Sequence, residues 1–340
     1  MHSACLPSPA SPVKQETLMI CRFTIGLSAC LLLFTAWQPV AAADQSLEEV
    51  IPKGVTPDPA QREVVEALAA RVSRCNAVYD EQGNLTAILL CNHNAFSRVK
   101  PETRPGVDDA TFAQLSVVPS LRQMQLLKQP LSDDAFAILQ QWPDLEIFCI
   151  EGHKGDNTGR FMRFINGHPK LKWLELKHLF GLDGTTVDEL EAFPQLVRLE
   201  LDNASATDRA LPFLQRNPQI RDFELHRSTM SNEEIAELVD SLPNLERLAL
   251  KPKGKCFDHR CLADVASLPK LKVFGFHHWK DKMFVWEDGI EHLADAPHLT
   301  HVECPKKMWD DEAMKKLRAA KPDLENAGKN IIVEFDDLSR

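Results

Sequence analysis

Apolar residues recur along this chain in one short motif, which returns every 24 to 28 residues over most of its length. Each copy starts with a proline, has an apolar residue two positions later, and has further apolar residues three and five positions after that. Eight copies start at Pro119, Pro143, Pro169, Pro194, Pro218, Pro243, Pro269 and Pro297. A ninth copy, without the proline, consists of Leu85, Ile88 and Leu90. Self-similarity at such a period is typical of solenoid proteins.

The last two apolar residues of each motif lie two positions apart, a spacing that places both on one face of a β-strand. A second apolar set follows at helical spacing, usually behind a helix start signal. Ser231 and Glu234, for example, form a capping-box pattern around the start of a helix that contains Ile235 and Leu238. The proline of the next motif then ends the helix. The sequence therefore predicts strand–helix units that bury their apolar faces by stacking on one another.

The motif resembles the L-x-x-L-x-L pattern of the leucine-rich repeat (LRR) family over residues 85–325. The Asn that this family has three positions after its last leucine is missing. That position is occupied by His93, Gln129, His153, Leu179, Ala204, Ser228, Lys253, Trp279 and Lys307. The repeat length and the Ser/Thr-Asp helix starts are similar to those of bacterial exported LRR proteins with helical convex sides. The resemblance implies an α/β, horseshoe-shaped solenoid with about nine parallel strands on its concave side and helices on its convex side.

Residues 1–43 have the pattern of a secretory signal peptide. Arg22 precedes an apolar run from Phe23 to Trp37, and Ala41–Ala43 supply small residues for cleavage before Asp44. Met19 is an alternative start, because residues 1–18 are polar. We therefore predict an exported protein, located in the periplasm or cell envelope or fully secreted, with no membrane span after cleavage.

Two alternatives for this segment stay open. An uncleaved anchor helix is one, although an apolar run of about fifteen residues is short for a membrane span. Lipidation is the other, since Leu27–Cys30 resembles a lipoprotein cleavage box, although the apolar run continues beyond Cys30.

Both ends of the repeat array are predicted to carry caps. Residues 44–84 are predicted to form a polar, irregular leader up to residue 59 and an amphipathic cap helix over Ala60–Arg74, with Val64, Val65, Leu68 and Val72 on one side. Such a helix would cover the exposed end of the core. Residues 326–340 are predicted to be a C-terminal cap or tail, with a last strand over Asn330–Phe335. Between the first two motifs, His93–Gly106 is predicted to project as a loop.

The net charge of the chain disfavours some classes of binding partner. The 39 Lys and Arg residues are outnumbered by 49 Asp and Glu residues, and removal of residues 1–43 changes the formal charge from −10 to −11. An acidic chain lacks the basic footprint of a nucleic-acid-binding protein and has no attraction to anionic membrane surfaces. A protein partner with a basic patch is the class that this charge favours.

The cysteines suggest two disulfides in an oxidising compartment. Cys75 ends the predicted cap helix and Cys91 follows the first strand, whereas Cys256 and Cys261 share one strand-to-helix loop. Free thiols are the alternative for both pairs. A zinc site of Cys256, Asp258, His259 and Cys261 is a further alternative, but a second ligand pair is missing.

The sequence matches no catalytic template. It has no Gly-rich phosphate loop, no G-x-S-x-G nucleophile motif and no H-E-x-x-H helix. We therefore predict a protein without catalytic residues, cofactor or metal.

The residues between the apolar positions of each strand are predicted to face the concave side. Glu175, Glu200 and Glu224 would then stand side by side on three successive strands, since adjacent strands lie about 4.8 Å apart. The surrounding positions are Trp173, Lys177, Arg198, Asp202, Asp222, His226 and Arg247. We predict that these ten residues form a partner-binding patch, with Trp173 as an exposed anchor. Because Glu200 is placed on the solvent side, Glu200→Lys is expected to leave stability near that of the wild type.

The predicted function is non-catalytic protein recognition through the concave face and the adjoining loops. A solvated concave face with binding elsewhere is one alternative, and a structural scaffold of the cell envelope is another. A cation site, or a metal-dependent enzyme that uses the acidic row with His226, is a third.

Overall fold

The computed structural model describes residues 47–92, 104–152, 158–179, 187–202, 210–253, 256–276, 286–303 and 311–327. The predictions for the signal peptide (1–43), for Cys30 and for a strand over Asn330–Phe335 lie outside these residues. So does most of the predicted loop over His93–Gly106.

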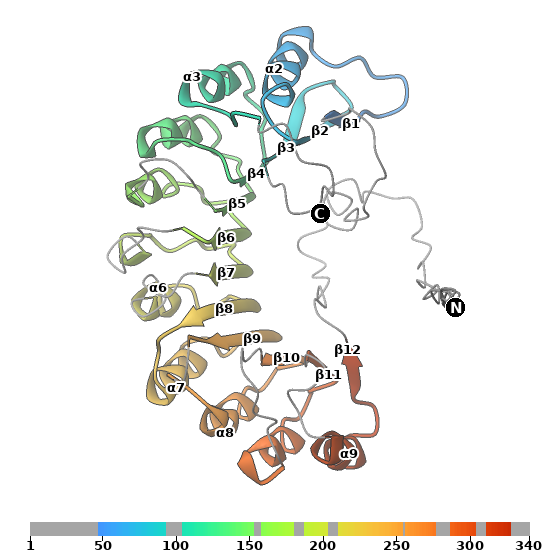
Figure 1. The fold of residues 1–340 in the computed structure, drawn as a ribbon, viewed down its shortest axis with the longest axis vertical. Helices are drawn as coiled ribbons and strands as arrows, with labels where there is room; N and C mark the ends of the chain where they lie inside the picture. Colours follow the sequence, from blue (N-terminus) through green and yellow to red (C-terminus); the bar gives the residue numbers. More distant parts are fainter. Residues whose placement is uncertain are drawn as a thin grey trace, which may run out of the picture.

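The described residues form one sheet whose strands follow one another in chain order. In Figure 1 these strands line the inner side of an arc, and the helices lie on its outer side. The strands are β1 (Leu47–Val50), β2 (Arg74–Tyr79), β3 (Leu85–Cys91), β4 (Gln123–Leu127), β5 (Ile147–Glu151), β6 (Trp173–Lys177), β7 (Arg198–Asp202), β8 (Asp222–Ser228), β9 (Arg247–Pro252), β10 (Val273–Phe276), β11 (His301–Glu303) and β12 (Glu325–Ala327). From β3 onward every neighbouring pair is parallel. This is an α/β solenoid with the architecture that the LRR resemblance implies, and the nine predicted strands are β3 to β11.

The outer side is less regular than predicted. Its α-helices are α3 (Asp109–Phe112), α6 (Leu211–Gln215), α7 (Asn232–Ser241), α8 (Leu262–Ala266) and α9 (Asp311–Ala320). Between them lie 3₁₀-helices at η2 (Ala113–Val117), η3 (Asp133–Gln141), η4 (Arg160–Phe164), η5 (His259–Cys261), η6 (Trp286–Asp288) and η7 (Ile290–Ala294). A 3₁₀-helix rises about 2.0 Å per residue against 1.5 Å for an α-helix, so it spans a repeat with fewer residues. The helix α7 begins at the predicted capping box of Ser231 and Glu234.

The N-terminal end differs from the prediction. The leader was expected to be irregular, but β1 lies within it and pairs with β2. The cap helix α2 (Pro59–Ala69) starts behind Asp58, whose side chain accepts from the Gln61 N–H, and it is shorter than predicted. It ends at Ala69 because the chain turns and enters β2, which runs antiparallel to β3. The predicted cap role of α2 is supported by its buried face, which joins the core of the first repeats.

The described end of the predicted projecting loop packs against this cap instead. Gly106 N–H donates to the Arg71 carbonyl over 3.0 Å, and the Arg71 Nε donates back to the Gly106 carbonyl over 2.9 Å. The Arg104 guanidinium donates to the carbonyl of Ala69. The three residues Arg104–Gly106 therefore fasten the first repeat to the cap helix.

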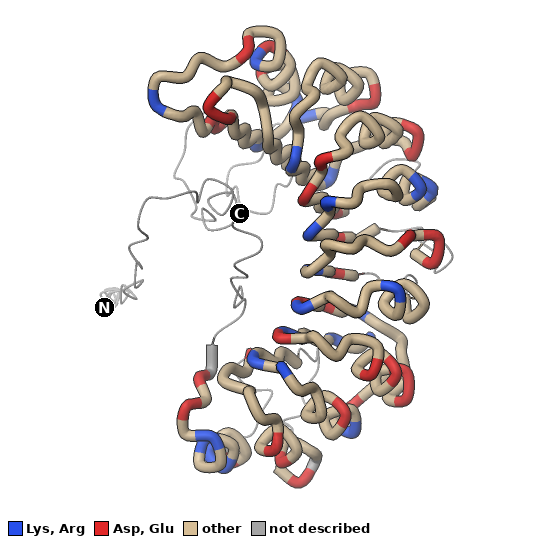
Figure 2. The backbone as a smooth tube through the Cα atoms, turned by 180° about the vertical axis from the view of Figure 1, so that it is seen from behind, with Lys and Arg blue, Asp and Glu red and all other residues tan. Residues whose placement is uncertain are grey.

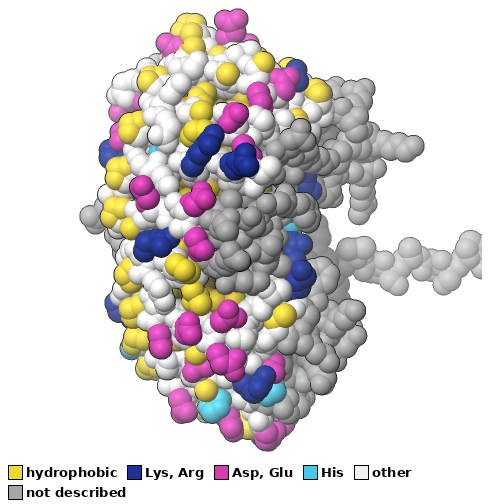
Figure 3. All heavy atoms as spheres, turned by 90° about the vertical axis from the view of Figure 1, so that its left-hand side faces the viewer, with side chains coloured by type: hydrophobic (Ala, Val, Ile, Leu, Met, Phe, Trp, Pro, Cys, Tyr) yellow, Lys and Arg dark blue, Asp and Glu magenta, His cyan; other side chains and the backbone are white. Residues whose placement is uncertain are grey.

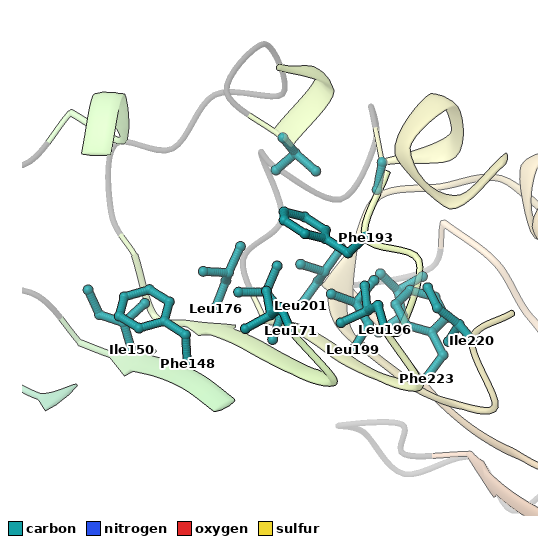
Figure 4. Close-up of a cluster of buried hydrophobic side chains, with 14 of the residues drawn as sticks. Phe148, Ile150, Leu171, Leu176, Phe193, Leu196, Leu199, Leu201, Ile220 and Phe223 are labelled. Atoms are coloured by element: carbon teal, nitrogen blue, oxygen red, sulfur yellow. The ribbon is translucent and has the colours of Figure 1, made fainter. Parts of the chain in front are cut away.

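One hydrophobic core runs along the solenoid between the strands and the outer helices. Leu199 on β7 stands in register between Leu174 on β6 and Phe223 on β8, and all three side chains are fully buried. Figure 4 shows Leu199 beside Leu196 and Phe223, with Phe193 entering from the outer side. The motif leucines therefore form the continuous core that the repeat pattern predicts.

Polar side chains tie the repeats together in place of the missing Asn. Gln129 is fully buried at the family's Asn position, where it accepts from the Val107 N–H and donates to the carbonyls of Leu90 and Leu127. Residues that precede the motif prolines form further hydrogen bonds between repeats. Asn217, which precedes Pro218, accepts from the Phe193 N–H of the preceding repeat over 2.8 Å. These bonds satisfy backbone groups where consecutive repeats meet.

The register predicts that Leu199→Ala costs about 2–5 kcal/mol of unfolding free energy, because it leaves a cavity that the flanking repeats cannot fill. Chemical denaturation followed by circular dichroism measures this loss. An unchanged denaturation midpoint would contradict the placement of Leu199 in the core.

Candidate functional site on the concave face

The structure brings the ten predicted site residues together on the concave side of β6 to β9. They stand in register as three columns, which are Trp173–Arg198–Asp222–Arg247, Glu175–Glu200–Glu224 and Lys177–Asp202–His226. The motif leucines between them point into the core instead. Figure 2 shows basic and acidic positions interleaved along this inner side of the arc.

The burial of these residues corrects the prediction that they are exposed. Asp222, Glu200 and Arg247 are 0%, 2% and 2% exposed, so Glu200 does not lie on an open solvent side. Trp173 is 5% exposed, and the Arg198 guanidinium stacks over its ring at 4.0 Å from the centroid. Strands about 4.8 Å apart allow long side chains to lie across their neighbours. Trp173 is thus covered by the cation–π contact and is not an exposed anchor.

Arg247 is the centre of the charged array. Its Nη1 donates to Asp222 Oδ1 over 2.8 Å and to Glu224 Oε1 over 2.6 Å. Its Nε and Nη2 donate to the two carboxylate oxygens of Glu303, each over 3.1 Å. The side chain reaches from β9 to β11 over β10, where Gly275 stands in register with Glu303 and has no side chain to block the path. This bidentate pair links strands that are two repeats apart.

A second group of charges neutralises the remaining carboxylates. The Lys177 ammonium lies 2.9 Å from Glu175 and 2.8 Å from Glu200. The Arg227 guanidinium donates to Asp202 over 2.6 Å and also contacts the ring of His178. The charged array is therefore largely paired within the described residues, which accounts for like charges standing side by side in one column.

The two central glutamates differ in their protonation. Burial raises the pKa of Glu200 well above its usual 4.5, and the flanking carboxylates of Glu175 and Glu224 raise it further. Lys177 does not reverse this, because its one ammonium is shared between two carboxylates. Burial acts in the same direction on Glu224, but Arg247 and Arg198 outweigh it and lower the pKa of Glu224 to about 2.

The described residues include one cluster with metal-ligand geometry. The ligand atoms of Glu200, Glu224 and His226 all lie within 4.8 Å of one another. Two carboxylates and an imidazole suit a divalent cation. Lys177 and Arg247 already pair with these carboxylates, however, so a bound cation would have to displace them. This competition weakens the alternative of a metal-dependent enzyme.

The predicted site residues did not include Glu303, Arg227 and His178, although the motif spacing does place Glu303 on the concave side. Glu303 lies 56 positions from Arg247, and only the absence of a side chain at Gly275 signals the contact. His178 and Arg227 follow the concave positions of β6 and β8 and adopt positive φ angles of 53° and 56°. An equivalent glycine, Gly152, is the one sequence signal for a left-handed residue at this point of the repeat.

The first predicted disulfide does not fit the strand register. Cys75 pairs with Leu90 and faces the core, whereas Cys91 stands opposite Arg74 on the other face of the hairpin. Side chains on opposite faces of a sheet cannot be bridged without a change of register.

The second predicted pair consists of thiols in the structure. The Cys256 Sγ donates to the Lys253 carbonyl over 3.0 Å, and Cys261 is buried in the core. Asp258, the third member of the zinc alternative, instead accepts from the backbone N–H of Arg260 and caps η5.

Comparisons with known proteins give no family for this chain and two distant structural likenesses. No protein-family model matches the chain, and no curated protein matches it. Among solved structures it is similar to TLR13 in a TLR13–ssRNA13 complex, at 18% identity and a TM-score of 0.45, over 74% of this chain and 37% of that one. It is also similar to the LRR protein LIC12759 of Leptospira interrogans, at 13% identity and a TM-score of 0.36, over 63% of this chain and 56% of that one. The chain thus covers less than two thirds of either protein.

Opposite pH dependences are expected for two conservative substitutions. A raised pKa means that the Glu200 carboxylate costs stability above the folded-state pKa and costs nothing below the unfolded value near 4.5. Glu200→Gln should therefore stabilise the protein at neutral pH, and the gain should vanish as the pH falls through 4.5. Glu224→Gln should destabilise it at neutral pH, with a deficit that shrinks as the pH falls toward 2. The midpoints of urea denaturation, measured across this pH range, test the sign of the stability change in both variants. The same pH dependence in both variants would refute the opposite pKa shifts of Glu200 and Glu224.

Arg247→Met is expected to cost about 3–5 kcal/mol, because it leaves the buried carboxylates of Asp222 and Glu303 without their guanidinium. Arg163→Met is the matched control. Arg163 pairs with Asp134 at the surface, where loss of an ion pair costs about 0–1 kcal/mol. Equal denaturant midpoints for the two variants would show that the Arg247 network does not stabilise the fold.

Proposed function

We propose that this chain is a non-catalytic recognition protein that binds another protein through its concave face and the rim of that face. The observation that carries the proposal is the ion-pair network from β6 to β11, which holds a wide polar surface in one conformation. A surface that is fixed before binding loses little conformational entropy when a partner arrives. Extended concave surfaces of solenoids are suited to this use.

The partner is expected to contact the rim, where the strands end. We define the rim as Glu151, Lys177, His178, Arg227 and Lys251. The side chains of Glu151 and Lys177 are 22% and 24% exposed, and those of His178 and Arg227 are both 35% exposed. Lys177, His178 and Arg227 are accessible at one end, while their contacts with neighbouring carboxylates fix them to the array. They therefore replace Trp173 and Glu200 as the expected points of contact.

Export through the segment 1–43 is part of this proposal, as is an extracytoplasmic protein partner. None of the helices in the described ranges is both long enough and apolar enough to cross a bilayer. Nucleic acid is a poor match for a chain with a formal charge of −10 whose concave cations are already paired.

Part of the negative charge is exposed on the convex side. Figure 3 shows acidic side chains gathered in the lower half of this side, and α7 contributes the exposed Glu233, Glu237 and Asp240. A partner with a basic patch would therefore find its counterpart on the convex side as well as on the rim. The experiment must therefore distinguish binding at the convex side from binding at the rim.

Affinity capture from envelope and medium fractions tests the proposal with two charge-exchange variants. Glu151→Lys/Lys251→Glu inverts two charges on the rim, and Glu237→Lys/Lys315→Glu inverts two charges on the convex helices. Neither changes the net charge. The wild type and the convex variant should retain the same protein, and the rim variant should lose it by about tenfold or more, as expected for a pair of interface charges.

Folding of each variant is checked by its urea midpoint before capture. Loss of the partner by the convex variant alone would move the site to α7 and α9. Equal retention by all three proteins would overturn the rim proposal. Absence of any specific protein, together with tight association with the envelope, would favour a structural scaffold.

A further inference from the structure

A buried histidine lies where the helices η3 and η4 of two consecutive repeats end. His168 precedes the motif proline Pro169 and is 2% exposed. Its Nδ1 lies 2.6 Å from the Ile165 carbonyl oxygen, and its Nε2 lies 2.9 Å from the Leu139 carbonyl oxygen. Both ring nitrogens therefore face a hydrogen-bond acceptor.

A neutral imidazole cannot satisfy both of these contacts. It carries one N–H group, and its other ring nitrogen is an acceptor with a lone pair. Whichever nitrogen is bare would direct this lone pair at a carbonyl oxygen only 2.6 or 2.9 Å away, where the two would repel each other. The imidazolium ion has two N–H groups, so it alone turns both contacts into hydrogen bonds. The geometry therefore fits a ring that holds two protons.

Comparable side chains in this solenoid match their partners in a neutral form. Asn217 and Trp142 also stand directly before a motif proline. Asn217 accepts from one backbone N–H and donates to one backbone carbonyl, and Trp142 donates its single indole N–H to a carbonyl. Beside His168, the Gln140 amide nitrogen carries two hydrogens and donates to two carbonyls. His168 is matched in the same way only in its charged form.

The backbone around the ring favours a positive charge. Leu139 lies in the last turn of η3, and Ile165 directly follows η4. The last carbonyl groups of a helix lack partners within the helix and carry partial negative charge, so they attract a cation. Burial acts in the opposite direction, because it disfavours the charged form of a histidine. Two hydrogen bonds that only the charged form can complete counteract this effect of burial.

Charged side chains on the neighbouring elements have other partners or lie at the surface. On η3, on η4, after the ring and in the next repeat, these side chains are Asp133, Asp134, Arg160, Arg163, Lys170, Lys172, Asp188, Glu189 and Glu191. Arg163 pairs with Asp134. Lys170 and Lys172 pair with carboxylates one repeat back. Asp133 accepts from backbone N–H groups at the start of η4. No ion pair within the described ranges includes His168, so the two carbonyl groups are what would hold its second proton.

We propose that His168 is a proton-binding site that strengthens the junction between the repeats of β4 and β5 in acid. The folded chain binds the second proton of this ring more tightly than the unfolded chain does, because unfolding replaces both carbonyl contacts by water. The stabilisation is therefore complete well below about pH 6.5, where an unfolded histidine is charged, and is lost at higher pH. This device belongs to the fold and is independent of the partner proposed above.

Urea denaturation of the whole chain at a series of pH values, from about 5.5 to about 8.5, tests the proposal with His168→Asn. Asparagine keeps a neutral hydrogen-bonding side chain, as Asn217 does in its own repeat, but cannot titrate. The folding constant of the wild type relative to that of the variant should fall as the pH rises, by up to about tenfold per pH unit, because one proton is released. Glu200 is present in both proteins, so its own pH dependence cancels at each pH. His298→Asn, at an exposed histidine, is the matched control, and its ratio to the wild type should stay constant.

Nitrogen-15 NMR of the histidine rings in the wild type measures the protonation directly and does not require a folded variant. His168 is the one buried histidine in the described ranges, so its ring N–H protons should exchange most slowly with solvent. At about pH 6.5, where half of an unfolded population is charged, both of its ring nitrogens should carry hydrogen in most molecules.

Three results would overturn the proposal. One bare nitrogen on the His168 ring at this pH would show that the folded chain holds the neutral form. A folding ratio between the wild type and His168→Asn that does not change with pH would show that the junction does not depend on a proton. A ratio that rises with pH would show that the fold excludes the second proton instead of binding it.

Discussion

Register between parallel strands is the constraint on which the rest of this structure depends. Because each strand meets its neighbour residue for residue, three concave positions per repeat become three columns of side chains about 4.8 Å apart. Side chains that lie so near to one another must either pair or move apart. The middle of the sheet solves this with the guanidinium groups of Arg198 and Arg247 and the ammonium group of Lys177, which lie between the carboxylates. The core leucines on the other face hold the columns in place.

The same constraint divides the concave face into two regions of different character. From β6 to β11 most charged side chains pair with one another, so that this region exposes mainly its rim. From β3 to β5 the concave columns are uncharged except for Glu151 at the end of β5, and they contain buried apolar residues and two buried amides.

The sequence predicts the solenoid, the nine central strands and the identity of the concave columns, because period and alternation depend on local spacing alone. It does not predict the burial of Glu200 or Trp173, which depends on how neighbouring long side chains lie across one another. The Arg247–Glu303 pair is also not predictable from the sequence, because its partners are 56 residues apart and meet only over Gly275. The strands β1 and β2 escape prediction because they carry no copy of the motif.

The reversal of direction between β2 and β3 has a consequence for assembly. A solenoid with identical open ends can add a second copy end to end, since the last strand of one matches the first strand of the next. Here the outermost strand β1 runs parallel to β2 and therefore opposite to β12. A second copy stacked in the same orientation would meet an antiparallel edge and could not continue the parallel register of the array. The hairpin thus gives the two outermost described strands opposite directions, so a second copy could pair with β12 through its β1 only in an antiparallel arrangement.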